Sequence, residues 1–293
     1  MKDIALFVGN DINNIEPGIS WKDLLNQIIA HYNLTKKIVL HSNKPFPLLY
    51  EEIFMQVIKN DPIKEASVKE YIGQKISDIS SNEIHDRIKE LGVKNIITTN
   101  YDYTLEGNNN LKNSGIIDER LYSIFRKTVV GKTNYWHIHG EANVPMSINL
   151  GYEHYGGQLQ HMRNYVVSGT NYASKKVHKK PLIRRIREKS IAELDMQSWI
   201  DLFFSRDIHI FGIGLDFIEI DLWWLITYRA RMKLYKGSSN LSNNIYYYTP
   251  TKYLADAASK IELMKVNDIS IIDFNIEDKK EYYNHVIDGI VKK

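Results

Sequence analysis

The C-terminal third of the chain alternates short apolar runs with longer amphipathic segments, and this alternation constrains the fold more than any other feature. Apolar runs lie at Asp207–Gly212, Asn244–Tyr248 and Ile269–Phe274, and the segments that follow them with helical spacing are Glu219–Tyr235, Tyr253–Val266 and Glu277–Val291. Strands that alternate with helices form a parallel sheet with helices on both faces. The sequence therefore predicts an α/β protein with a Rossmann-like parallel sheet.

The first two thirds of the chain supply further strands. Buried strands are expected at Asp3–Val8, Asn95–Thr99 and Tyr135–Ile138, with a short extra strand at Ser147–Leu150. These runs are short, apolar and bounded by glycine or polar residues, as buried strands are. They extend the parallel sheet predicted from the C-terminal third.

Helical spacing fills the stretches between these strands. A loop over Asp11–Gly18 leads to a helix at Trp21–Tyr32, for which Ser20 is the expected N-cap. Amphipathic helices follow at Leu48–Ile58, Val68–Ile79 and Asn82–Leu91, and later at Tyr152–Val167 and Pro181–Leu194. We predict a single domain over residues 1–293, with helical insertions at about 44–92 and 152–194.

Composition excludes several chemistries. The 293 residues include no cysteine, which excludes disulfides, thiolate catalysis and cysteine-based zinc sites, and which fits a reducing cytosol. The densest apolar stretch, Leu222–Ile226, is far shorter than the roughly 20 residues that a membrane span needs. The net charge of +3 gives no strong argument for nucleic acid. We expect a cytoplasmic protein that makes no membrane contact.

Polar and glycine residues follow four of the expected strands. The clusters are Gly9-Asn10-Asp11-Ile12-Asn13, Thr98-Thr99-Asn100-Tyr101-Asp102, His137-Ile138-His139-Gly140-Glu141 and Gly212-Ile213-Gly214-Leu215-Asp216. Each alone fits ordinary turn or N-cap chemistry. Ligands of open parallel sheets bind beyond the carboxyl ends of the strands, so together the clusters predict one site. The G-x-G-x-x-G fingerprint of dehydrogenases is absent.

The ordered set of clusters resembles the sirtuin superfamily. Gly9–Asn13 stands where sirtuins have Gly-Ala-Gly-x-Ser, Gly18–Trp21 resembles the continuation of that loop, Thr99–Asp102 is similar to Gln-Asn-Ile-Asp, Ile138–Gly140 to Leu-His-Gly, and Gly212–Leu215 to Gly-Thr-Ser-Leu. The resemblance implies NAD+ binding with Asn100 and His139 as catalytic residues. The cofactor-binding residues that it implies are Gly9, Asn10, Asp11, Asn13, Trp21, Thr99, Asp102, Gly212, Gly214, Leu215 and Asp216.

Within the superfamily, Leu150–Tyr155 and Phe217–Leu225 resemble bacterial sirtuin-like NAD+ hydrolases of antiphage defence more than protein deacetylases. Deacetylases of the family usually carry a four-cysteine zinc ribbon, which this chain cannot build; the helical region at about 152–194 takes its place. The resemblance thus implies an NAD+ glycohydrolase that needs no metal. Two alternatives stay open: a protein deacylase or ADP-ribosyltransferase with an added acceptor cleft, and a catalytically silent sensor of NAD or ADP-ribose.

The expected chemistry assigns roles to several side chains. Asn100 hydrogen-bonds a ribose hydroxyl or orients water, and neutral His139 accepts a proton because its ordinary pKa lies near the working pH. By resemblance, Asp102 holds the nicotinamide carboxamide. Asp216 either binds a ribose or caps a helix. In a regular strand His137 shares a face with His139 and is expected to support it.

Partners are expected outside the active site. The segment Glu219–Tyr235 is apolar nearly all round, which indicates full burial or an interface in a homo-oligomer. Some relatives occur beside a HerA-type ATPase, so the resemblance implies such a partner. The basic segment Lys175–Lys189 predicts a solvated helix face or a patch for nucleic acid or an acidic partner, and nucleic acid is expected only as an indirect partner.

Asp11 departs from the family pattern, which has glycine at this position. Three readings stay open: the carboxylate repels a negative ligand and acts as a brake on NAD+ binding, it marks a chain that only senses nucleotide, or it turns to solvent.

Overall fold

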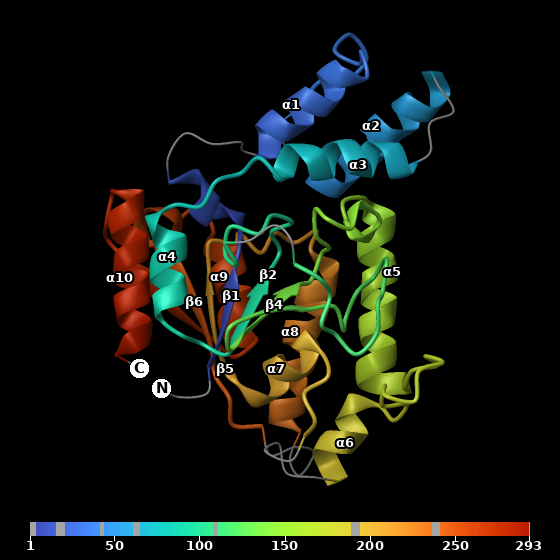
Figure 1. Ribbon diagram of the computed structural model, residues 1–293. Helices are drawn as coiled ribbons and strands as arrows, with labels where there is room; N and C mark the ends of the chain where they lie inside the picture. The colour runs from blue at the N-terminus through green and yellow to red at the C-terminus, as the bar shows by residue number, and fades with distance from the viewer. Residues whose placement is uncertain are drawn as a thin grey trace.

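The computed structural model describes residues 4–15, 21–41, 44–60, 65–107, 111–188, 194–235 and 241–292, without the side chains of residues 21, 22 and 60. Seven strands form one sheet in the order β3-β4-β2-β1-β5-β6-β7 (Figure 1). Their bounds are β1 Ile4–Val8, β2 Asn95–Thr98, β3 Thr128–Val130, β4 Thr133–His137, β5 Asp207–Phe211, β6 Ile245–Pro250 and β7 Ile269–Phe274. All neighbours pair in parallel except β3 and β4. The predicted Rossmann-like α/β fold is confirmed.

The direction of chain progression reverses at β1. The chain passes from β1 to β2 and β4 on one side, and then returns to the other side of β1 to form β5, β6 and β7. Such a reversal opens a crevice beyond the carboxyl ends of the two strands that flank it, here β1 and β5. Gly9 follows β1 and Gly212 follows β5, so two of the predicted clusters lie at this crevice.

Helices cover both faces of the sheet because β1 is apolar on both. Leu6 and Val8 face α4 (Glu83–Glu90) and α10 (Lys279–Val291), whereas Ala5 and Phe7 face the opposite side. The second face is covered by α7 (Trp199–Ser205), α8 (Ile220–Leu234), α9 (Ala258–Val266) and the helix pair α5 (Tyr152–Arg163) and α6 (Leu182–Glu188). This alternation of burial along β1 is the period of two that a strand imposes.

A helical cap lies over the carboxyl ends of the strands, at the top of Figure 1. It consists of α1 (Trp21–His31), α2 (Phe46–Asn60) and α3 (Glu65–Ile76), and its core also takes in Tyr101, Ile148 and Leu150 of the sheet domain. The sequence analysis grouped α4 with α2 and α3. In the structure α4 instead packs on the sheet, because Ile84 and Ile88 join the core of β1 and α10.

Several local expectations were wrong. Ser147–Leu150 is not a strand: Pro145–Ser147 forms a 3-10 helix, and the next residues run on as a buried loop. Asn10–Asn14, expected as loop, forms another 3-10 helix, whereas Ser20 and Gly18 lie outside the described residues. Strand β3 and helix α7, which have three and seven residues, were not expected from the sequence. Helix α5 runs on as a π-helix over Asn164–Ser168.

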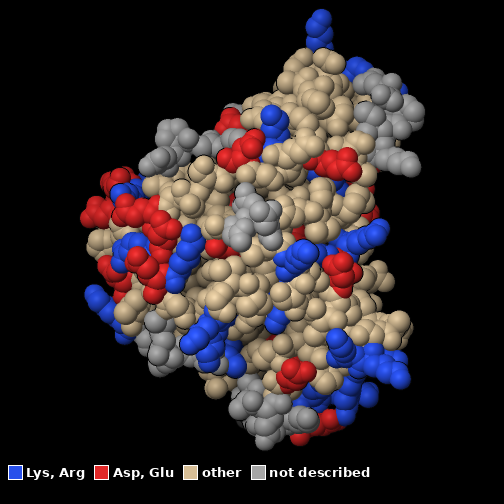
Figure 2. All heavy atoms as spheres, in the orientation of Figure 1, with Lys and Arg blue, Asp and Glu red and all other residues tan. Residues whose placement is uncertain are grey.

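The basic segment splits into buried and exposed parts. Arg185 is buried and donates to the Tyr165 hydroxyl at 2.7 Å, so it is a core residue. Within the described part of this segment, residues 175–188, the exposed lysine and arginine side chains are Lys175, Lys176, Lys179, Lys180, Arg184 and Arg187. Lys and Arg side chains gather at the lower right of Figure 2, where α6 lies in Figure 1. This surface fits a solvated helix face and also a patch for nucleic acid or an acidic partner.

The sequence pattern suggested that helix α8 is apolar nearly all round. In the structure the helix also buries two charged side chains, Asp221 and Arg229. Leu222, Leu225 and Ile226 are buried in the core, while Trp223 and Trp224 are half-buried. No helix in the described part of the chain has the length and apolarity to cross a membrane.

The first loop and the β5 loop pack backbone against backbone at Gly9. A Cβ at Gly9 would lie 2.4 Å from the carbonyl oxygen of Gly212 and 2.5 Å from Ile213 Cβ. We expect Gly9→Ala to lower the free energy of unfolding by about 1–3 kcal/mol, as overpacking does. The matched control is Gly156→Ala on α5, where a Cβ meets nothing within 4 Å. That change should stabilise by about 0.5–1 kcal/mol. Urea denaturation measures both, and equal effects would contradict the close packing.

Candidate active site

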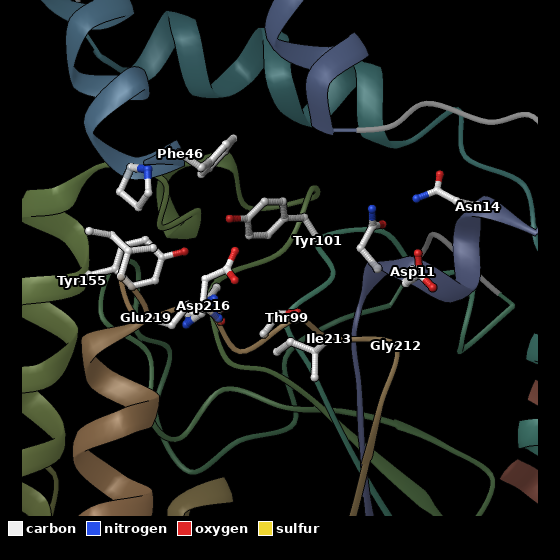
Figure 3. Close-up of a pocket in the computed structure, with 15 residues that line it drawn as sticks. Asp11, Asn14, Phe46, Thr99, Tyr101, Tyr155, Gly212, Ile213, Asp216 and Glu219 are labelled. Atoms are coloured by element: carbon white, nitrogen blue, oxygen red, sulfur yellow. The ribbon is translucent and has the colours of Figure 1, made fainter. Parts of the chain in front are cut away.

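A pocket of about 280 Å³ lies at the crevice between β1 and β5, beneath helix α2 of the cap (Figure 3). It is lined by Asn10, Asp11, Asn14, Phe46, Pro47, Thr99, Tyr101, His139, Tyr155, Gly212, Ile213, Gly214, Asp216, Ile218 and Glu219. Figure 3 shows Asp11 and Asn14 at one end of the pocket, and Tyr155 with Glu219 at the other. Phe46 of α2 lies above, so the cap completes the pocket.

The structure brings residues from all four predicted clusters to this pocket. The predicted site residues that line it are Asn10, Asp11, Thr99, His139, Gly212, Gly214 and Asp216. Two others hold the surrounding loops: Gly9 N donates to the Phe211 carbonyl at 3.0 Å, and Leu215 is buried with a φ of 47°. Trp21 begins α1, but its side chain lies outside the described residues.

Asn100 does not itself line the pocket; it is buried and lies in the chain between Thr99 and Tyr101, which do line it. Its side-chain oxygen and nitrogen both lack a hydrogen-bond partner among the described residues. Leaving a buried polar group unpaired costs about 1–3 kcal/mol, so native proteins rarely do it without a functional reason. The Asn100 amide thus has a free donor and a free acceptor for a polar ligand.

His137 holds the backbone of Asn100 in place. Its Nδ1 lies 2.7 Å from the carbonyl oxygen of Asn100, and its Nε2 lies 2.7 Å from Oε1 of buried Glu106. Burial alone lowers the pKa of His137, but the charge and hydrogen bond of Glu106 outweigh it and raise the pKa to about 9. Protonated His137 therefore donates from both ring nitrogens. Its expected supporting role is directed at Asn100, not at His139.

His139 is engaged with a residue that the sequence analysis missed. Its Nε2 donates to Oδ2 of Asp221 on α8 at 3.0 Å, and both side chains are buried. Burial lowers the pKa of His139, but Asp221 and Glu219 together raise it above the ordinary value. The Asp221 carboxylate therefore favours the protonated ring over the neutral ring that was expected from the sequence. The Tyr155 ring packs edge-on against it, 5.1 Å between centroids.

Glu219 is a second missed residue of the pocket. Its Oε2 accepts a hydrogen bond from the backbone N–H of Asp216 at 2.8 Å. Burial raises the pKa of Glu219 and His139 lowers it, and with the charges of Asp221 and Asp216 the result is about 7. The sequence held a signal for it, because Glu219 and Asp221 follow the predicted cluster Gly212–Asp216 within five residues.

Asp102 and Asn13 lie beside the pocket and do not line it. Asn13 donates to Asp102 Oδ2 at 2.9 Å, and Thr104 N donates to Asp102 Oδ1 at 3.0 Å. His85 Nε2 lies 2.8 Å from Asn13 Oδ1, and burial lowers the pKa of His85 to about 4, so neutral His85 donates there. These side chains satisfy one another and stiffen the loops below the pocket.

The Asp11 side chain contacts the C-terminal helix α10. Its carboxylate pairs with Lys279 at 2.7 Å and accepts from the Tyr283 hydroxyl at 2.5 Å, both on α10. The backbone N–H of Asp11 donates to the Gly212 carbonyl at 2.9 Å. The charge of Asp11 at the pocket rim is thus compensated by a lysine, a partner that the sequence reading of this residue did not include.

Comparison with known proteins fits this geometry. A family model described as the SIR2-like domain matches residues 94–191, a stretch that includes Asn100 and His139. The match supports a relationship to the sirtuin-like superfamily. SIR2-like proteins are generally NAD-dependent enzymes, so the match implies use of NAD+. The search of curated proteins gave no match. Among the described residues, no group of three or more His, Asp or Glu side chains could hold a metal ion.

Proposed function

We propose that the protein is an NAD+ glycohydrolase, which cleaves the bond between nicotinamide and ribose and releases nicotinamide and ADP-ribose. The observation that carries the proposal is the buried, unpartnered amide of Asn100 beside a pocket at the reversal point of the sheet. A site built to bind a polar ligand leaves such groups unpaired until the ligand arrives. The pocket volume of about 280 Å³ lies just below the roughly 300–1,000 Å³ range of ligand pockets.

The proposed reaction needs little acid catalysis. The C–N bond breaks with its electron pair on nicotinamide, which leaves as a neutral molecule, and a water oxygen bonds to the ribose carbon. Asn100 hydrogen-bonds a ribose hydroxyl or orients this water. His139 pairs with the buried Asp221 carboxylate, whose negative charge offsets that of a protonated ring, so the pair adds little repulsion against the positive charge that develops on the ribose.

An assay with three arms tests the proposal. The protein is mixed with NAD+ alone, with NAD+ plus an acyl-lysine peptide, and with NAD+ in a calorimeter. Release of nicotinamide and ADP-ribose from NAD+ alone supports a hydrolase. Turnover that depends on the peptide would favour a deacylase, and binding without turnover a sensor.

A role in antiphage defence and assembly as a homo-oligomer, with a HerA-type ATPase as partner, belong to the same proposal. Half-buried Trp223 and Trp224 on α8 offer apolar surface for such an assembly. Light scattering that shows a monomer at micromolar concentration, with and without NAD+, would count against the oligomer.

The ion pair of Asp11 and Lys279 predicts opposite effects of two substitutions on NAD+ binding. Asp11→Asn removes a negative charge at the pocket rim and frees Lys279, so NAD+ should bind more tightly. Lys279→Met leaves the Asp11 charge uncompensated, so NAD+ should bind more weakly. One charge at about 4 Å in water contributes roughly 1 kcal/mol, or about fivefold in Kd.

Titration calorimetry at low and high salt measures both effects, which should shrink as salt screens the charges. Lys280→Met is the matched control, because Lys280 pairs with Glu83 on α4. If Asp11→Asn binds NAD+ no more tightly than the wild type, the Asp11 charge does not act on the ligand.

A further inference from the structure

We propose that Glu219 is the proton acceptor of the reaction, and that Asp221 is a positioning residue that holds His139. This inference rests on the proposed hydrolase function and deepens it. The water oxygen bonds to the ribose carbon as nicotinamide leaves with the C–N electron pair. One proton of that water passes to the Glu219 carboxylate and from there to solvent.

The pairing of the acidic side chains around the pocket singles out Glu219. Three carboxylates line the pocket, and two are paired with lysine: Asp11 with Lys279 at 2.7 Å and Asp216 with Lys260 at 3.2 Å. Glu219 has no lysine or arginine partner in the described part of the chain. Although His139 lowers its pKa, burial keeps the pKa of Glu219 at about 7, which suits a proton acceptor.

The carboxylate of Glu219 is also held in position. Glu219 directly precedes α8, and its Oε2 accepts a hydrogen bond from the backbone N–H of Asp216. Its Oε1 makes no hydrogen bond to any described residue, so one oxygen is anchored and the other is free for water. Glu219 shares the pocket with His139 and Tyr155, and Figure 3 shows it at the Tyr155 end.

The alternative acceptor, His139, is already occupied. Its Nε2 donates to Asp221, and that carboxylate raises the pKa of the ring, which favours the form that cannot take a further proton. Glu219, by contrast, loses its own proton at about pH 7, where a general base works best. The free Oε1 of Glu219 therefore makes it the better placed acceptor of the two.

The test is the pH dependence of NAD+ cleavage by the wild type and by Glu219→Gln. Wild-type kcat/KM should rise with pH through about 7, as Glu219 loses its proton. Glu219→Gln should lower kcat/KM by about 10²–10⁴-fold, the usual contribution of a general base, and remove the rise with pH. NAD+ affinity measured by calorimetry should change by less than about threefold, because the glutamine keeps the shape and the Asp216 hydrogen bond. The matched control, Glu262→Gln on the exposed face of α9, should keep both rate and pH profile.

Asp221→Asn separates positioning from proton transfer. It should lower kcat and keep the rise with pH, because Glu219 is still present. A Glu219→Gln variant that keeps the rise near pH 7 would overturn the role of Glu219. A wild-type profile without this rise would also overturn it, and that result does not depend on how well the variant folds. Absence of any NAD+ cleavage by the wild type would instead overturn the proposed function, and the role of Glu219 with it.

Discussion

Asn100→Ala is expected to abolish most NAD+ cleavage and to leave the stability of the protein nearly unchanged. The loss should be about 10²–10³-fold in kcat, as for removal of a fixed hydrogen-bond donor at a reacting centre. The free energy of unfolding should stay within about 1 kcal/mol of the wild type or rise, because the amide has no described partner to lose. Activity and stability are therefore expected to separate at this residue.

Steady-state kinetics and urea denaturation of the same preparations measure the two effects. The matched control is Asn134→Ala, at an asparagine near the amino end of β4 that donates to the Lys94 carbonyl, at the opposite end of the strands from the pocket. A variant Asn100→Ala with near wild-type turnover would show that Asn100 does not take part in the reaction. A large loss of stability would show that its amide has a structural role.

The second large effect is a fall in stability with rising pH, caused by His137. Its pKa is about 9 in the folded protein, above the ordinary value of 6.5. A raised pKa stabilises the fold fully below pH 6.5, and this stabilisation is lost as pH rises through 9. Each pKa unit corresponds to about 1.4 kcal/mol, so the free energy of unfolding should fall by about 3 kcal/mol over this range.

His137→Gln should be less stable than the wild type by about 3–5 kcal/mol at pH 6, because buried Glu106 loses its cationic partner and keeps only the hydroxyl of Thr128 among its described hydrogen-bond donors of the native structure. It should also lack most of the fall between pH 6.5 and 9. Urea denaturation at several pH values measures both, with His285→Gln, at an exposed histidine of α10, as the control. A wild-type stability that is constant or rises over this range, relative to His137→Gln, would contradict the protonated His137–Glu106 pair.

Much of the fold follows from the sequence because its periodic patterns are long. The alternation after residue 207 fixed β5, β6, β7 and the helices between them to within a few residues, apart from a shorter α9. Strand β3 and helix α7 were missed because three and seven residues are too few to establish a period. The position of α4 could not be predicted, because an amphipathic pattern gives the apolar face of a helix but not the surface that this face covers.

The site was predictable in part for a similar reason. Parallel strand ends meet at one edge of a sheet, so the convergence of Asn10, Thr99, His139 and Gly212 follows from topology. The pairing of His139 with Asp221 does not, because it joins residues 82 positions apart through the packing of α8. The role of Glu219 depends on burial and neighbouring charges, which only the folded chain provides.

The measurement that tests the central claim most directly is the product analysis of NAD+ incubated with the purified protein and with Asn100→Ala. We predict that the wild type converts NAD+ to equal amounts of nicotinamide and ADP-ribose without an added acceptor, and that the variant forms almost none. Intact NAD+ after prolonged incubation with folded wild-type protein, under conditions where calorimetry shows that NAD+ is bound, would contradict the account.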